Sequence, residues 1–411
     1  MRTFPGFAAI VVMSLIVFKA QAEKVFTFKQ AFTIALQNNP ELQVEINKAA
    51  AMKGVFIQSK LYPNPQLSLT AENIGGSGLY SGYESAETTL SVTQPVPLGN
   101  RLKYMQNATY AEYLASLAHI KVQKTILYVA VGTAYIDALY AEQWQQVTRK
   151  LTRVNKDIVT AIKRRVEAGA GAELDLRLAE IRLGEARIQE NKSARETLKQ
   201  RAKLARLTGT GLLVDNPLND SGLQHNQWVW GKLEKKMSQS PQLFEKQLQL
   251  KAKRAAIVAV KRAVWPDLNI QLGGRHFSDD GSNAAVVSAY SQIPVYNRNQ
   301  GSIMTAEAEY TQMARDYQGT NLAVRQNLYT AFLQAEQSRF EADLLTDSLV
   351  PLARKSLKLA KEGYQMGRYT YIELSTALNT LIEEERHYQQ AHADYHKALI
   401  QINGITGLDD Q

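Results

Sequence analysis

The chain has 411 residues, carries a formal charge of +9 and contains no cysteine, which excludes disulfides, thiolate metal sites and a lipidated N-terminal cysteine. Its basic residues alternate with Glu, Asp and Gln at helical spacing, as on a solvated helix surface, and no zinc-finger or RNP-type spacing indicates a nucleic-acid partner. Walker loops, GxSxG elbows and HExxH motifs are also missing from the sequence. We therefore expect neither an enzyme nor a catalytic residue nor a cofactor.

Residues 1–22 are predicted to be a cleaved signal peptide. Arg2 supplies the positive charge, residues 7–18 form a short apolar stretch, and the Ala-Gln-Ala triplet at 20–22 fits the small-x-small cleavage rule. The mature chain would then begin at Glu23. An uncleaved membrane anchor is the alternative, although the apolar stretch is short for a transmembrane helix.

The sequence repeats itself at an offset close to 200 residues. The two copies are predicted to span residues 23–209 and 229–411, with a polar linker at 210–228. The recurring markers include Asn39-Pro40 with Ser240-Pro241, Pro97 with Pro294, Gly169 with Gly367, and Thr208-Gly209 with Thr406-Gly407.

Each copy should open with short helices followed by two strands. In the first copy, helices are expected at about 27–39 and 41–60, and the prolines at 63 and 65 end the second one. Period-2 alternation of apolar and polar residues then predicts strands of roughly 9–11 residues. Their expected positions are about 66–73 and 86–96 in the first copy, and about 267–277 and 284–293 in the second.

A long helical hairpin should complete each copy, at about 100–206 and about 297–405. A helix from residue 101 to 168 would be roughly 100 Å long, so it must pack side by side with similar helices as in a coiled coil. Pro351 predicts a bend or discontinuity in the second hairpin. One packing seam is predicted in the first, along Val122, Ile126, Val129, Thr133, Ile136 and Tyr140.

Four strands are too few to close a barrel in a membrane, since bacterial barrels need about eight. An open sheet would leave unpaired edge groups in hydrocarbon. We therefore expect a mainly α fold with membrane β-strands, in which three copies form a 12-stranded β-barrel continuous with a periplasmic α-helical barrel.

The whole mature chain resembles the TolC-like outer-membrane efflux proteins. The duplicated plan, the Asn-Asn-Pro-Glu-Leu motif at 38–42 and the Gly-to-Asp-Leu turns carry this resemblance. The stretches 62–67 and 94–101 look most like the CzcC-like branch, which serves heavy-metal cation efflux.

The resemblance implies a homotrimeric duct in the outer membrane, in contact with its lipid, that exports heavy-metal cations. Its partners would be a periplasmic adaptor and an inner-membrane resistance-nodulation-division pump. A multidrug efflux or type I secretion duct remains the alternative cargo assignment. A periplasmic adaptor or structural coiled coil without a pore is the alternative from another class.

The two hairpin turns, residues 169–176 and 367–374, are the candidate functional site. Glycine gives a sharp reversal the backbone freedom it needs. In the resembling family these turns form the closed periplasmic tip and meet the adaptor, with acidic positions that could favour cations. The capped turn with solvated acids is the structural alternative. The candidate residues are Gly169, Gly171, Asp175, Gly367, Glu373 and Thr376, the last standing where the family often has a second aspartate.

Three histidines near the C-terminus are candidate metal ligands by residue type. His392 and His396 are four residues apart and share a helix face, with His387 one turn upstream. No cysteine or third ligand at a clear spacing accompanies them. We therefore expect packing or surface positions for these side chains and predict no metal site.

Overall fold

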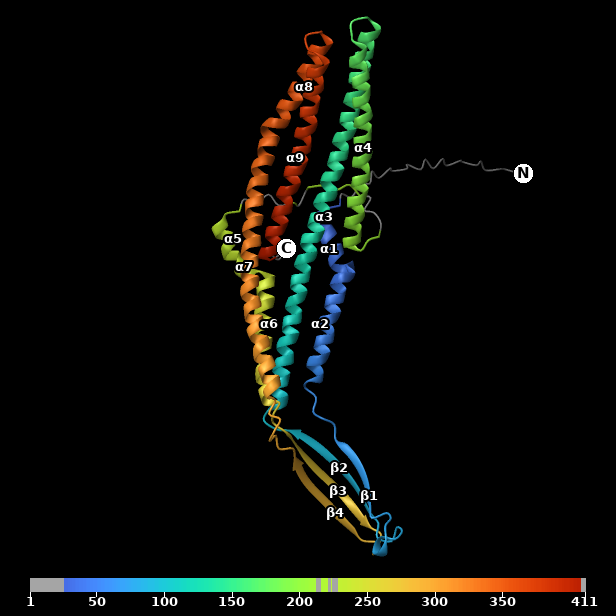
Figure 1. The fold of residues 1–411 in the computed structure, drawn as a ribbon, viewed down its shortest axis with the longest axis vertical. Helices are drawn as coiled ribbons and strands as arrows, with labels where there is room; N and C mark the ends of the chain where they lie inside the picture. Colours follow the sequence, from blue (N-terminus) through green and yellow to red (C-terminus); the bar gives the residue numbers. More distant parts are fainter. Residues whose placement is uncertain (1–25, 212–215, 221–222, 224–227, 408–411) are drawn as a thin grey trace, which may run out of the picture.

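The computed structural model describes residues 26–211, 216–220, 223 and 228–407. The predicted signal peptide at 1–22 and parts of the predicted linker lie outside these residues. In the described chain, long helices run side by side along one axis, and a single sheet extends from one end of them (Figure 1). The tips of the two hairpins lie at the opposite end.

The first two helices, α1 (Phe28–Asn38) and α2 (Pro40–Gln58), meet at Asn39. The side-chain oxygen of Asn39 accepts a hydrogen bond from the Leu42 backbone N–H at 3.0 Å, and its amide nitrogen donates to the Leu207 carbonyl oxygen at 3.0 Å. Asn39 is thus both an N-cap for α2 and a tie to the last turn of the first hairpin. This gives the Asn-Asn-Pro motif its structural role.

The four strands form one antiparallel sheet in the order β1-β2-β3-β4. The central pair, β2 and β3, joins the two copies, so β1 and β4 are the outer strands. The first strand has seven residues, fewer than the predicted 9–11, and Asn73 follows it in a left-handed conformation (φ 56°). The strands are β1 (Gln66–Glu72), β2 (Glu87–Pro97), β3 (Asp267–Phe277) and β4 (Asn283–Ser291).

The two faces of the sheet differ in chemistry. Leu90 on β2 pairs with Leu69 and Gly274, and Val92 pairs with Leu67 and Leu272, so apolar side chains share one face. That face is open to the surroundings: Leu90 is 53% exposed. The opposite face carries polar side chains, of which three on β2 are buried: Thr89, Ser91 and Thr93.

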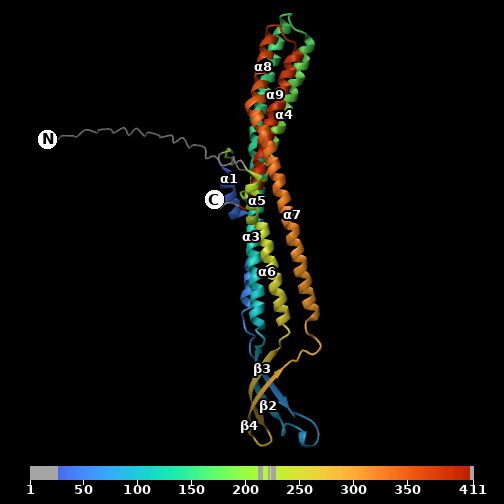
Figure 2. The same ribbon diagram turned by 90° about the vertical axis from the view of Figure 1, so that its left-hand side faces the viewer.

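Most of the remaining helices form two hairpins: α3 with α4, and α7 and α8 with α9 (Figures 1 and 2). Among the described residues, no helix combines the length and apolarity needed to cross a lipid bilayer. The first hairpin is α3 (Arg101–Glu167) with α4 (Glu173–Thr208). The second copy contributes α5 (Trp230–Lys236), α6 (Pro241–Arg262), α7 (Gln300–Leu344), α8 (Val350–Gln365) and α9 (Tyr371–Thr406).

The discontinuity predicted around Pro351 is present. A π-helical turn, Leu345–Leu349, separates α7 from α8. Proline lacks an N–H donor and its ring crowds the carbonyl four residues earlier, and a wider turn relieves that crowding. By contrast, α3 is one unbroken helix of 67 residues. Hence the two repeats differ in the first helix of the hairpin, which is continuous in the first repeat and interrupted in the second.

The core follows α3, which packs against helices of both copies. Tyr135 is fully buried there, and its hydroxyl oxygen lies 2.6 Å from the Phe26 carbonyl oxygen and 2.7 Å from the Asn219 carbonyl oxygen. Part of the predicted seam is wrong: Ile126 is 50% exposed, while Leu127 and Val131 are buried instead. With neighbours on several sides, α3 buries a broader face than a single coiled-coil stripe.

Candidate functional site

Both hairpin tips turn at a glycine in the left-handed region. Gly169 has φ of +70° and Gly367 has φ of +74°, values that side chains with a Cβ rarely adopt. Gly171 is favoured for a different reason: a Cβ there would lie 3.1 Å from the Val166 backbone nitrogen, closer than ordinary van der Waals contact. The glycines proposed from the sequence therefore shape the tips, which is a positioning role.

Arg165, in the last turn of α3, connects the two hairpins at the tip. One guanidinium nitrogen donates to the backbone carbonyl of Tyr364 at the end of α8, and another donates to the Ala170 carbonyl at 3.1 Å. The guanidinium also lies over the Tyr364 ring, 4.8 Å from its centroid. Arg165 is not among the candidate residues predicted from the sequence. The basic run at 163–165 is a usual sign of a helix C-terminus, but it does not identify a partner nearly 200 residues away.

Asp175, in the first turn of α4, faces the same tyrosine. Burial, followed by the charge of the nearby Asp175 carboxylate, raises the pKa of the Tyr364 hydroxyl above its usual value. Arg165 and Asp175 of the first hairpin thus both meet Tyr364 of the second. The acidic residue proposed from the sequence belongs to the junction between the hairpins.

Glu373 makes a local contact of the kind named as the structural alternative, in which the acid caps its own turn. Its carboxylate accepts from the Thr370 backbone N–H at 2.6 Å and from the Thr370 hydroxyl at 2.9 Å, completing a capping box at the start of α9. These hydrogen bonds hold the pKa of Glu373 below its usual range, so its charge is retained. The side chain is exposed, as is that of Thr376, whose hydroxyl donates to the Ile372 carbonyl.

The three histidines occupy separate environments on α9. His387 is exposed, His392 lies 3.1 Å from the Thr346 hydroxyl oxygen, and His396 is buried beside the rings of Tyr140 and Tyr395. Across the described ranges, no group of three or more His, Cys, Asp or Glu side chains is arranged to hold a metal ion.

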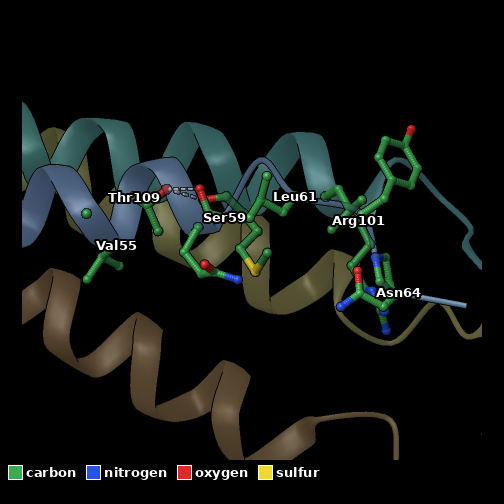
Figure 3. Close-up of a pocket in the computed structure, with 12 residues that line it drawn as sticks. Val55, Ser59, Leu61, Asn64, Arg101 and Thr109 are labelled. Atoms are coloured by element: carbon green, nitrogen blue, oxygen red, sulfur yellow. Dashed lines mark hydrogen bonds between the residues drawn. The ribbon is translucent and has the colours of Figure 1, made fainter. Parts of the chain in front are cut away.

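A groove of about 750 Å³ lies where the helices meet the sheet, between the end of α2 and the start of α3 (Figure 3). Two pairs of polar side chains close across the groove and its edge. The Arg101 guanidinium pairs with Asp267, the first residue of β3, at 2.6 Å, and the Ser59 hydroxyl lies 2.8 Å from that of Thr109. We therefore assign the groove to the joint between helices and sheet.

An elongated chain with a two-faced sheet at one end and two helical hairpins at the other is built to line a passage. The comparisons with known proteins agree with that class. The sequence profile described as "Outer membrane efflux protein" matches residues 32–210 and 233–408. The chain therefore belongs to the outer membrane efflux protein family, and it is an outer-membrane efflux channel protein. The resemblance proposed from its motifs is confirmed.

Three similar proteins are named for the systems in which they act. The chain is 24% identical over 400 residues to the cobalt-zinc-cadmium resistance protein CzcC of Cupriavidus metallidurans, covering 95% of this chain and 92% of the relative. It is 25% identical over 203 residues to the toluene efflux pump outer membrane protein TtgF of Pseudomonas putida, covering 47% of this chain and 42% of the relative. A crystal structure of CusC is similar in fold, with a TM-score of 0.79 at 20% identity and 92% of both chains covered. These relatives are efflux proteins rather than enzymes.

Proposed function

We propose that three copies of this chain assemble into a closed duct that carries heavy-metal cations outward through the outer membrane without transforming them. The main evidence for this assembly is the structure of the sheet. Its apolar face is exposed, and its outer strands β1 and β4 each have one edge without a strand partner in the described chain. Lipid cannot satisfy such an edge, whereas pairing β4 of one copy with β1 of the next satisfies every edge at once.

The proposed cargo follows from the relative matched over 95% of the chain, which is named for resistance to cobalt, zinc and cadmium. Toluene and similar solutes are the second candidate, because the relative matched over 47% of the chain is named for toluene efflux. Deleting the gene separates the two: a metal duct predicts sensitivity to divalent metal salts with unchanged tolerance to toluene.

The hairpin tips are the proposed contact with a periplasmic adaptor, which would connect the duct to a proton-driven pump in the inner membrane. The turns are narrow, glycine-shaped and exposed, and the charged Glu373 is presented at one of them. In a trimer, three Glu373 carboxylates could line the aperture and favour cations. In each of the three chains, the two repeats, 23–209 and 229–411, would each contribute one hairpin.

Extraction of the outer membrane with detergent tests the assembly. We expect a particle with the mass of three chains and stepwise conductance when it is added to a planar lipid bilayer. A monomer that stays soluble without detergent would refute the duct and favour a periplasmic adaptor or structural coiled coil.

A further inference from the structure

Charge is distributed unevenly between the sheet and the helices. The whole chain has a formal charge of +9, yet its two strand-loop-strand segments, 66–97 and 267–291, contain six carboxylates and a single Lys or Arg, which is Arg275. The sheet end is therefore acidic on a basic protein, and Arg275 is the one fixed positive charge in these segments.

Arg275 uses its whole guanidinium on the polar face of the sheet. Its Nε donates to the Thr89 hydroxyl at 2.9 Å, one terminal nitrogen donates to the Glu87 carboxylate at 2.6 Å, and the other donates to the Glu72 carboxylate at 3.0 Å. One side chain on β3 thus binds residues on β2 and β1. Lysine, with a compact ammonium, could not keep this fork of parallel contacts.

The two carboxylates need such a partner. Glu72 and Glu87 lie directly opposite each other in the β1–β2 register, a position where like charges repel. The guanidinium between them offsets that repulsion and leaves the cluster of each chain with one net negative charge. All three side chains remain partly open to solvent.

The cluster lies at the end of the sheet remote from the helices. Glu72 is the last residue of β1, and Arg275 is two residues before the end of β3, whereas the opposite end of β3 starts at Asp267 beside α3. The adjoining loops add Glu84, Asp279 and Asp280. Hydrogen bonds from Ser282 hold the pKa of Asp280 below its usual range, so this loop charge is retained.

We propose that Arg275 is the residue that sets the ionic selectivity of the outer mouth of the duct, by neutralising one of two carboxylates on the face turned to the passage. This inference rests on the proposed function, because only a closed trimer brings three such clusters around one opening. It assigns a second charge-selecting position, at the far end of the molecule from the hairpin tips.

The test is the reversal potential of reconstituted trimers in a potassium chloride gradient. Replacing Arg275 by Gln leaves two carboxylates uncompensated in each copy and should raise the ratio of potassium to chloride permeability about twofold or more. The double variant E72Q/E87Q should lower that ratio. A residue that only braces the strands would not shift selectivity in opposite directions.

R325Q is the matched control, since Arg325 forms an ion pair with Glu234 in the helical part of the chain, and it should leave the ratio unchanged. If R275Q fails to assemble, E72Q/E87Q still decides the matter, because neutral amides remove the repulsion that Arg275 offsets. Unchanged selectivity in conducting variants would overturn the assignment while the duct stands. Absence of any conductance in the wild-type protein would instead refute the proposed function.

Discussion

Substituting Arg165 by Ala should loosen the junction between the two hairpins. In the structure this side chain donates to the Tyr364 and Ala170 carbonyl oxygens and covers the Tyr364 ring. Alanine removes all three contacts, and the Tyr364 carbonyl oxygen then keeps the Gly367 backbone N–H, at 3.1 Å, as its donor. The helices are held by their own backbone hydrogen bonds, so we expect the tips to separate while the helices stay folded.

The size of the effect follows from the contacts. A hydrogen bond from a charged donor contributes about 1.5–3 kcal/mol, and a cation–π contact at a partly exposed site contributes about 0.5–1 kcal/mol. Only the hydrogen bond to the Tyr364 carbonyl and the contact with its ring join the two hairpins. Because Arg165 is only half-buried, the low end applies to that hydrogen bond, and ordering the long side chain offsets a further part. A net loss of about 2 kcal/mol would change the ratio of joined to separated hairpins about 30-fold.

Single-channel recording of purified trimers measures this ratio. If the joined tips correspond to the low-conductance state, R165A should increase the time spent in high-conductance states by about an order of magnitude. R164A is the control, because Arg164 is the exposed neighbour with the same charge and no side-chain contact to the second hairpin in the described structure. Equal records from R165A and R164A would refute the reasoning, since only the charge would then matter.

Three further predictions concern stability and assembly. Y135F removes the hydroxyl beside two backbone carbonyls and should lower the free energy of unfolding by about 1–3 kcal/mol in thermal melts. Burial raises the pKa of Tyr135 to about 12, so the stability tied to its neutral form should be complete below pH 10 and decline as the pH rises to 12, a decline absent from Y135F. L90R should reduce the yield of heat-resistant trimers by an amount equivalent to about 2–4 kcal/mol if Leu90 faces lipid near the midplane, whereas normal yield would contradict that orientation. T370A should weaken the start of α9 by about 1 kcal/mol, detected as faster amide exchange there. The stability contributed by the ionised Glu373 carboxylate should be fully present above pH 4.5 and should be lost as the pH falls through its lowered pKa.

The order of elements was predictable because it depends on local chemistry. Proline positions, period-2 alternation and the repeat located the strands and the hairpins, and Pro351 located the π-helical turn. Small shifts arose from single residues: α7 begins at Gln300, three residues later than expected, because Asn299 adopts a left-handed conformation as its N-cap. Asn100 does the same before α3, so Asn100 and Asn299 are structural counterparts in the two repeats.

Contacts between distant segments were not predictable from patterns. Arg165 and Arg275 each occur in ordinary polar surroundings, and nothing near them in the sequence indicates Tyr364 or Glu72 as a partner. The exposed Ile126 fails for a related reason, since an apolar residue at helical spacing reports a preference for burial but not which neighbour is present to bury it.

The two repeats have the same order of elements, but their hairpins differ in how easily they bend. The first hairpin has an unbroken α3, whose last turn supplies Arg165 and whose middle forms the core with Tyr135. The second hairpin is interrupted by the π-helical turn and is held to the first at Tyr364. A π-helical turn loses regular backbone hydrogen bonds, so bending costs least there. Movement of the tips is therefore expected to arise in the second hairpin against the first, with Arg165 as the contact that must break.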